Sequence, residues 1–237
     1  MVRPAPQLLV LALCALCATA CGPAEQPAPP SPAGASAVDW PPGTVLAVEG
    51  SPITLEEIDE ASVWVERVSP SSTPDHLRRL ALTNVVLPRH LARLLAGTAR
   101  EQALEQARAE LARLRAGTWE GTRDADGNHG QGLSGGYLQL GLELWGRGSD
   151  LPPGEWSEPF ESEGRFVLLR RTALRPAPVP IAIEIDADVL VFPFLDRATY
   201  PREIESAYDR FHLTVVDPSW RALVPESLQY RMGASPP

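Results

Sequence analysis

Apolar residues recur every three or four positions over much of the first half of the chain, which predicts amphipathic helices. A Val-rich segment at 44–48, a Gly turn and Pro52–Ile53 come first and predict a small strand hairpin. Thr54–Glu57 then has the spacing of a capping box, so we expect a helix over Leu55–Val68. Four residues form its predicted buried face: Ile58, Ala61, Val65 and Val68.

Two further helices are predicted before residue 118. Thr73–Asp75 gives the first of them a cap, a proline in its first turn and an acid near the positive end of its dipole. Pro88 predicts a kink in this helix, and Gly97 predicts its end. Thr98–Glu101 repeats the capping-box spacing and opens a helix that we expect to run to Gly117.

Strand signals dominate the second half of the chain. Leu151–Arg171 contains a Pro-Pro-Gly turn, an acidic loop that closes on Gly164, and the apolar run Phe166–Leu169. This order predicts two strands joined by a tight loop. After a short proline-rich connector we expect two more strands, at 181–185 and 189–192, with a turn at Asp186 and Asp188 between them. They are followed by a helix to about Phe211, a strand at 213–216 and a final helix capped by Asp217. The fold class predicted is therefore α+β.

The first 20 residues have the pattern of a cleaved targeting segment. Arg3 gives a positive start, and the apolar core Leu8–Ala20 is too short to span a bilayer as a helix. Small residues, Ala18–Ala20, stand directly before Cys21, which resembles the signal of a bacterial lipoprotein in which that cysteine is lipidated, with Ala18 in place of the usual Leu. A secretory signal with incidental cysteines is the alternative. Residues 21–43, rich in Pro, Ala and Ser, are expected to be a tether; a Pro-rich recognition motif is the alternative.

Composition and charge narrow the possible functions. The formal net charge is −9, and all 21 basic residues are Arg. Loss of Arg3 with the signal would leave 20 Arg against 30 acidic residues, a surface that repels nucleic acid. Cys14 and Cys17 would also leave with the signal and Cys21 would carry lipid, so no thiol would remain for a disulfide, a catalytic site or a thiolate metal site.

Two glycine motifs in residues 130–136 suggest enzyme sites. Gly132–Gly136 matches the Gly-x-Ser-x-Gly nucleophile pattern around Ser134, and Gly130–Gly135 matches a dinucleotide fingerprint. The partners of a triad would come from Asp186, Asp188 or Asp196 and from His212. Both motifs need a strand leading into them, whereas Arg123–Gln131 is polar and turn-rich, so we expect a loop and neither site.

A calcium loop is also weakly suggested. Asp124, Asp126 and Asn128 have the spacing of its first three ligands, but His129 and Gly135 replace the required Gly and Glu, so we expect a solvated turn. The histidines share no ligand spacing: His76, His90, His129 and His212. No metal site or cofactor is predicted.

The sequence VLAVEGSPITLEEID, from Val45, resembles the opening of SurA-type periplasmic chaperones and related parvulin (PpiC-like) prolyl isomerases. Three later pieces follow in the family's order. They are the helix from Ala99 to Gly117, the Gly135–Gly136 segment, which is similar to the family's Gly-Gly-Asp-Leu signature, and the hairpin containing Gly154, Gly164 and Phe166. The resemblance covers roughly residues 44–172.

Departures from the family bear on catalysis. Phe166 stands where the family carries a His in the last strand, and no strand with its His precedes Ala99, although His90 lies in that part of the chain. The Met and Phe of the family's proline pocket have no clear counterpart. Prolyl isomerisation is a rotation over a barrier of about 18–20 kcal/mol, lowered by desolvating and orienting the imide. We therefore expect weak or absent isomerase activity and name no catalytic residue.

The resemblance implies a SurA-like helical module at 44–97, a reduced parvulin-like α/β domain at 98–175 and a small α+β segment at 176–237. The last segment either docks on the first module, through residues such as Trp220 and Leu223, or has its own core. The implied function is a lipid-anchored envelope folding factor that holds unfolded client polypeptides. Gly22 after Cys21 resembles lipoproteins of the outer membrane that face the periplasm. The alternative is an accessory lipoprotein of an envelope complex that retains only the fold.

Overall fold

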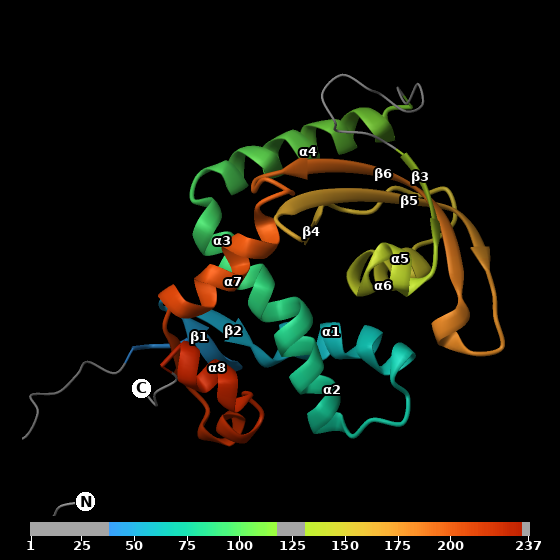
Figure 1. Ribbon diagram of the computed structural model, residues 1–237. Helices are drawn as coiled ribbons and strands as arrows, with labels where there is room; N and C mark the ends of the chain where they lie inside the picture. Colours follow the sequence, from blue (N-terminus) through green and yellow to red (C-terminus); the bar gives the residue numbers. More distant parts are fainter. Residues whose placement is uncertain (1–37, 118–130, 234–237) are drawn as a thin grey trace, which may run out of the picture. The chain divides into compact units, whose positions relative to one another are not determined.

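Two antiparallel sheets, each with helices packed against it, make up the part of the chain that the structure describes (Figure 1). The structure, a computed structural model, describes residues 38–117 and 131–233. From Asp39 onward these residues belong to one compact unit. The mixture of helices and antiparallel strands confirms the predicted α+β class.

The first sheet joins the two ends of the unit. β1 (Thr44–Val48) and β2 (Ser51–Thr54) form the predicted hairpin, and β7 (Leu213–Val215) pairs with the other edge of β1. Trp220 is buried in the same core cluster as Val45. Because a strand and a core residue of the C-terminal segment belong to this module, the segment docks on it and does not have a separate core.

α1 (Leu55–Val68) starts at the predicted capping box. The Thr54 hydroxyl accepts a hydrogen bond from the Glu57 backbone N–H at 3.3 Å, and the Glu57 carboxylate accepts one from the Thr54 backbone N–H at 3.2 Å. Two orphan donors of the first turn are thereby satisfied. The buried face contains Trp64, whereas Val68, which was predicted to be buried, is half-buried.

The predicted second helix is divided by a π-helical turn. α2 (Pro74–Ala81) begins at the Thr73 cap, and α3 (Leu87–Ala96) ends at Gly97, as predicted. The break lies in η1 (Leu82–Val86), before Pro88, and Pro88 itself lies in the first turn of α3. Pro88 has no N–H to donate to the preceding turn, and its ring would clash with the carbonyl four residues before it. The wider π-helical turn leaves room for the ring there, so the disruption precedes the proline.

α4 (Ala99–Arg115) has the predicted position but not the predicted cap. Thr98 adopts helical dihedrals, φ −72° and ψ −18°, and its side chain makes no capping hydrogen bond. A capping hydroxyl reaches the first turn when its residue is extended, as Thr54 is. The second capping-box prediction is therefore wrong.

The second sheet has the strand order β3-β6-β5-β4. Its strands are β3 (Gln131–Gly135), β4 (Phe160–Ser162), β5 (Arg165–Arg175) and β6 (Glu184–Pro193). β4 and β5 form the predicted hairpin. Glu163 and Gly164 turn the chain with φ values of 47° and 74°, a geometry that suits glycine at the second position.

β6 is one continuous strand, and the predicted turn at Asp186 and Asp188 is wrong. Both carboxylates face arginines across the ladder: Arg175 donates to Asp186 at 2.9 Å, and the Arg170 Nε donates to Asp188 at 3.0 Å. These cross-strand pairs let two acidic residues remain within a strand. Ile181, predicted to start a strand, lies in the 3-10 turn η2 (Pro180–Ala182).

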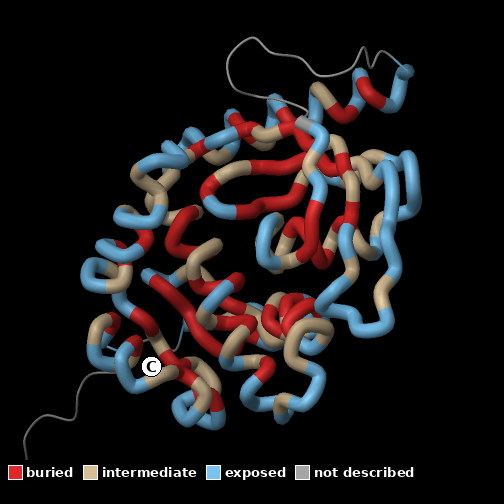
Figure 2. The backbone as a smooth tube through the Cα atoms, turned by 45° about the vertical axis from the view of Figure 1, so that its right-hand side comes forward, coloured by how far each residue is buried: buried red, intermediate tan, exposed pale blue. Residues whose placement is uncertain are grey.

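Different helices cover the two faces of the second sheet. α4 packs on one face and α6 (Leu142–Asp150) on the other, with the short α5 (Tyr137–Leu140) beside it. The side chains under α4 join the main core, whereas those under α6 form a separate small cluster. In Figure 2 the buried positions follow the strands and the inner faces of the helices.

The C-terminal segment ends in short helices. α7 (Tyr200–Arg210) agrees with its prediction. The predicted final helix is instead a 3-10 turn, η3 (Pro218–Ala222), capped by Asp217, and a separate α8 (Glu226–Arg231). Pro225 stands between them and provides no N–H to continue the first of them.

Candidate functional site

A hollow lies between α1 and α6 and is called here the α1–α6 groove. Its volume is about 490 Å³. Aromatic, aliphatic and proline side chains form much of its lining, with charged groups among them: Glu60, Val63, Trp64, Arg147, Asp150, Leu151, Pro152, Ser157, Glu158, Pro159 and Phe160. Concave sites with this balance of apolar walls and few polar groups are typical of ligand binding.

The close approach of α1 and α6 depends on a glycine. A Cβ atom placed on Gly146 would lie 2.5 Å from Cγ of Trp64, so only glycine lets the indole lie against α6. Trp64 is 4% exposed. Gly148, farther along α6, has the equivalent role toward the sheet, where Ile185 and Leu169 leave no room for a side chain. α6 is therefore held closely on both sides.

Arg147 joins the two walls of the groove. Its guanidinium lies 4.8 Å from the ring centre of Trp64 and 4.9 Å from that of Phe160. It also donates to the Glu60 carboxylate at 3.0 Å. Since a guanidinium between two aromatic rings is attracted to both of them, Arg147 connects α1 to β4 without closing the groove.

The rim of the groove carries acidic side chains that are paired with arginines outside it. Asp150 pairs with Arg67 at 2.8 Å, and Glu158 pairs with Arg115. Val63 of α1 is 48% exposed at this rim. The available contact surface is thus apolar, and most of the rim charge is already neutralised.

A polar network lies beside the groove at the junction of α1 and α3. The His90 Nε2 is 3.3 Å from Glu57, and Arg93 lies 3.4 Å from the same carboxylate. Burial alone would raise the pKa of Glu57, but the hydrogen bond and charge of His90, the Thr54 N–H and Arg93 lower this pKa to about 2. Glu57 thus combines a helix cap with an ion pair.

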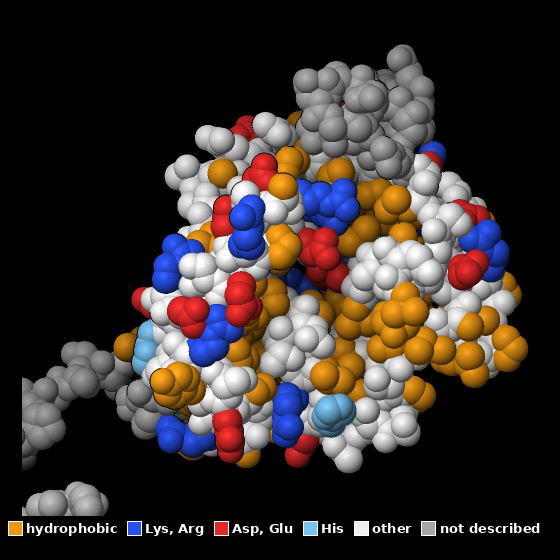
Figure 3. All heavy atoms as spheres, in the orientation of Figure 1, with side chains coloured by type: hydrophobic (Ala, Val, Ile, Leu, Met, Phe, Trp, Pro, Cys, Tyr) orange, Lys and Arg blue, Asp and Glu red, His pale blue; other side chains and the backbone are white. Residues whose placement is uncertain are grey.

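An ion pair between α3 and α6 is almost fully enclosed. Arg89 and Glu143 have side chains 10% and 12% exposed. Burial raises the pKa of Glu143, although Arg89 and Arg147 act to lower it. The ion pair of Arg89 and Glu143 fixes α3 against α6, because either charge alone would be costly to bury. Figure 3 shows one face of the unit, on which basic and acidic side chains lie among apolar ones around a central hollow.

The family-signature glycines lie at turns and strand ends. Gly135 ends β3, and Gly136 caps α5, its N–H donating to the Gln139 side chain at 3.1 Å. Gly154 lies in the loop before β4 and donates its N–H to the Arg171 carbonyl at 2.8 Å. Gly164 lies in the β4–β5 turn, against the Tyr200 ring. None of these four glycines lines the α1–α6 groove.

Phe166 is a core residue. Its side chain is 3% exposed, and its ring centre lies 5.5 Å from that of Phe194. The Arg100 guanidinium lies 5.4 Å from the Phe166 ring centre. No histidine lies in the described strands of the second sheet. The position at which the family has its second His is therefore filled here by apolar packing.

The hydrolase residues are not brought together in the part of the chain that the structure describes. Ser134 lies in β3 and α5 follows it, while nearly all of the turn-rich segment Arg123–Gln131 lies outside the described residues. Its hydroxyl accepts a hydrogen bond from Arg175 at 2.7 Å, while His212 donates its backbone N–H to Glu49 beside the first sheet. Ser134 lies within an edge strand that continues to Gly135 and not at the sharp strand-to-helix turn of a nucleophile elbow, and no imidazole of the described residues contacts it.

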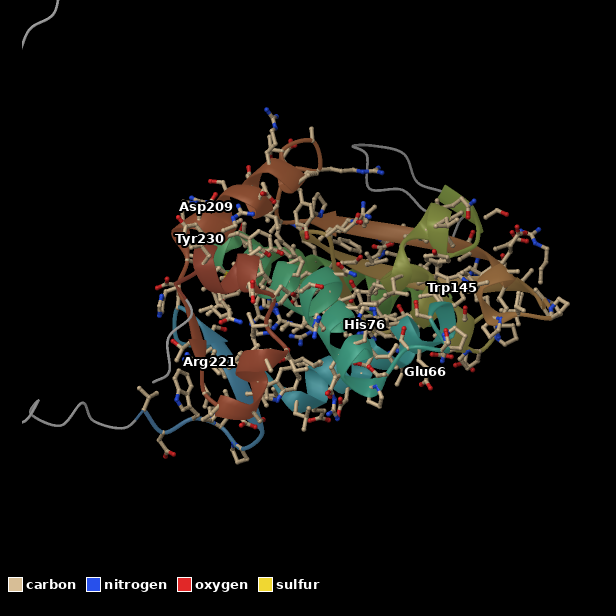
Figure 4. The ribbon with its side chains drawn as sticks, turned by 60° about the horizontal axis from the view of Figure 1, so that its bottom comes forward. Glu66, His76, Trp145, Asp209, Arg221 and Tyr230 are labelled. Carbon is tan, nitrogen blue, oxygen red and sulfur yellow. The ribbon has the colours of Figure 1, made fainter. Side chains whose placement is uncertain are left out.

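The described histidines lie on separate elements. His76 is exposed at the start of α2 (Figure 4), His90 is buried on α3, and His212 precedes β7. In the described ranges no three His, Cys, Asp or Glu side chains are grouped to hold a metal ion. Other predicted positions lie outside these ranges: the signal peptide, Cys21 and most of the tether, and the possible calcium ligands at 124–129.

Sequence reasoning missed the two residues at the centre of the groove. Trp64 follows Ala61 by three positions, so the helical period of α1 carried a signal for it. Arg147 had no such signal, because its role depends on rings contributed by α1 and β4. By contrast, Pro152, Pro159 and Phe160 belong to the Leu151–Arg171 stretch, which the sequence pattern predicts as a structural unit.

Comparison of the chain with protein-family models, with curated proteins and with solved structures gave no match.

Proposed function

We propose that this protein is a lipid-anchored folding factor of the cell envelope, of the SurA and parvulin type, that holds extended segments of unfolded client polypeptides. The observation that carries the proposal is the α1–α6 groove, where Trp64, Phe160 and two prolines surround a volume of about 490 Å³. Grooves lined by aromatic residues bind extended and proline-containing peptides, because such segments lose little conformational freedom on binding.

The order of the elements supports the resemblance to the parvulin family. A long helix, a Gly-Gly segment and a closing hairpin follow one another as α4, β3–α5 and β4–β5. The family's strand before the helix has no counterpart here, since no strand lies between β2 and Ala99. β6, from the C-terminal side of the hairpin, pairs between β3 and β5 and completes the sheet.

Holding is favoured over isomerisation. Phe166 is packed in the core, and the described sheet strands lack the imidazoles that the family carries. We propose weak or absent prolyl isomerase activity. A protease-coupled isomerisation assay tests this proposal: a rate comparable to that of active parvulins would contradict it.

The anchor is part of the proposal and rests on the sequence around Cys21. Across residues 38–117 and 131–233, no helix has the length and apolar character needed to cross a membrane. Attachment through a lipid on Cys21, at the periplasmic side of the outer membrane, is the proposed location. Mass spectrometry of the mature N-terminus, with and without Cys21→Ser, tests it; an unmodified cysteine would contradict it.

Suppression of aggregation tests the holding role. An unfolded outer-membrane protein, diluted from urea, should aggregate less in the presence of excess protein. Val63→Asp should reduce this protection, because it places a charge at the apolar rim of the groove. Val179→Asp is the matched control, since Val179 is 52% exposed and lies outside the groove.

Two results would overturn the holding role. One is equal protection by the Val63→Asp and Val179→Asp variants, and the other is no protection at all. Recovery of a single stoichiometric partner in pull-downs, in place of many unfolded clients, would favour the alternative of an accessory lipoprotein in an envelope complex.

A further inference from the structure

A second hollow, called here the basic hollow, continues from the α1–α6 groove. Its volume is about 320 Å³, and it shares Arg147, Pro159 and Phe160 with the groove. Its remaining lining consists of arginines, one glutamate and two apolar side chains: Arg89, Arg93, Arg100, Leu104, Arg108, Glu161 and Phe166. One extended chain could therefore contact both hollows.

The arginines come from two consecutive helices. Arg89 and Arg93 are four residues apart on α3, and Arg100 and Arg108 are eight residues apart on α4, with Leu104 midway between them. Residues at these spacings share one face of a helix. The faces of both helices meet at the hollow, which concentrates guanidinium groups there.

The carboxylates around the basic hollow are fewer than the guanidiniums. Glu161 on β4 is the one acidic residue in its lining, and it is shared by the Nε groups of Arg93 and Arg100, each at 2.8 Å. Arg108 is exposed, and in the described part of the chain it has no ion pair or hydrogen bond. Carboxylates just outside the lining also pair with three of these arginines: Glu143 with Arg89, Glu57 with Arg93 and Glu60 with Arg147. The positive charge that no carboxylate of the described residues neutralises is that of Arg108, in a protein whose net charge is −9.

Two further donors in this region lack partners. The Nε atoms of Arg89 and Arg147 are buried and make no hydrogen bond to the residues described. Because these two donors are buried, it is the exposed guanidinium of Arg108, next to the apolar side chains of the lining, that favours a carboxylate attached to an otherwise apolar chain.

We propose that the basic hollow binds an Asp or Glu side chain of the same extended segment whose apolar residues occupy the α1–α6 groove. Preferred clients would then carry an acidic residue a few positions from an apolar or proline-containing stretch. This inference rests on the proposed holding function and adds the client sequence that the site prefers. Charge complementarity provides the specificity, because the apolar contacts alone do not distinguish one end of a segment from the other.

Peptide binding tests the proposal. Fluorescence anisotropy compares labelled peptides that have the same Leu-Pro-Phe core and carry either two Asp or two Asn residues on one side, with each pair made in both orientations. We expect the Asp peptide to bind roughly two- to fivefold more tightly in one orientation, the size of effect given by an exposed ion pair. Added salt should remove the preference.

Arg108 variants locate the effect. Arg108→Gln should abolish the preference for Asp, and Arg108→Glu should reverse it. Arg202→Gln is the control: Arg202 is exposed on α7, lies outside both hollows, and carries the same charge. Since Arg108 is exposed and has no ion pair or hydrogen bond to the described residues, neither Arg108 variant removes a native polar contact among them.

The outcomes separate this inference from the holding function. Equal binding of Asp and Asn peptides, or a preference for Asp that persists in both Arg108 variants, overturns the inference and leaves the holding function in place. Failure of every peptide to bind overturns both. If inorganic phosphate binds in the absence of any preference for Asp, the hollow is a site for small anions, which also overturns the peptide proposal.

Discussion

The two faces of the second sheet are packed in different ways. Under α4, residues such as Phe166, Leu168 and Leu190 belong to a core that continues through the first sheet and the C-terminal helices. Under α6, the buried cluster has six members: Leu144, Phe160, Val167, Leu169, Ala187 and Val189. The α1–α6 groove and another hollow of about 450 Å³, beside Leu133 and Val189, border this second side, whereas the basic hollow lies at the edge of the α4 side. The α4 face thus carries most of the continuous core, and the α6 face has the smaller cluster and the larger of the proposed binding hollows.

Neighbouring leucines of β5 test this difference most directly. Leu168 faces α4 and Leu169 faces α6, and both are almost fully buried. We expect Leu168→Ala to lower the free energy of unfolding by about 2–5 kcal/mol. Leu169→Ala should be nearer the low end of this range, because the small cluster beside open hollows can relax around the lost atoms. Urea denaturation of both variants measures this difference, and a larger cost at Leu169 would contradict it.

A single methyl group on α6 should disturb the binding side. Gly146→Ala places its Cβ atom against the Trp64 ring, so the indole must move. Overpacking of this kind costs about 1–3 kcal/mol, which exceeds the gain of about 1 kcal/mol expected from replacing Gly by Ala within a helix. Unfolding midpoints and tryptophan fluorescence should both change.

Gly132→Ala is the control for this substitution. Gly132 is exposed on strand β3 and has no positive φ, and the position that its Cβ would take has no neighbouring atom within 4 Å. We expect the stability of this variant to remain close to that of the wild type. An equal loss in both variants would show that the effect is not specific to the contact between α1 and α6.

Acid should weaken the junction of α1 and α3 through Glu57. The pKa of Glu57 is lowered from 4.5 to about 2, so its ionised form stabilises the fold above about pH 4.5. This contribution is lost as the pH falls from about 4.5 to about 2. Glu57→Gln keeps an acceptor for the Thr54 N–H but removes the charge near His90 and Arg93, so its stability should depend less on pH over this interval. Urea midpoints of the wild type and of Glu57→Gln, measured between about pH 4.5 and about pH 2, test this expectation. If both midpoints depended on pH in the same way, the pH dependence would not come from Glu57.

The sequence was most informative where structure is local. The bounds of α1, its capping box and the β4–β5 turn depend on residues within a few positions of one another, and the structure confirms them. The continuity of β6 was missed because Asp186 and Asp188 look like turn residues until Arg175 and Arg170 are placed opposite them.

Features that join distant parts of the chain were harder to predict. Docking of the C-terminal segment on the first module was anticipated only as one of two alternatives, through the resemblance, and the pairing of β1 with β7 was not predicted. The Arg spacing on α3 and on α4 is visible in the sequence, but the meeting of both faces at one hollow depends on how the two helices pack. The same holds for the contact between Trp64 and Gly146, which needs α1 and α6 in place.

The smallest predicted effect compares two identical capping motifs. Thr54 and Thr98 both precede a Glu at the third position, yet only Thr54 is extended and accepts the capping hydrogen bond. Thr54→Ala should cost about 1 kcal/mol, the usual value for losing a cap, whereas Thr98→Ala should be nearly neutral. Urea unfolding of the two variants compares them within one protein. Equal losses of stability in the two variants would mean that the Thr98 hydroxyl caps α4 in solution. Thr98 would then have to become extended, which requires the junction of α3 with α4 at Gly97 to open.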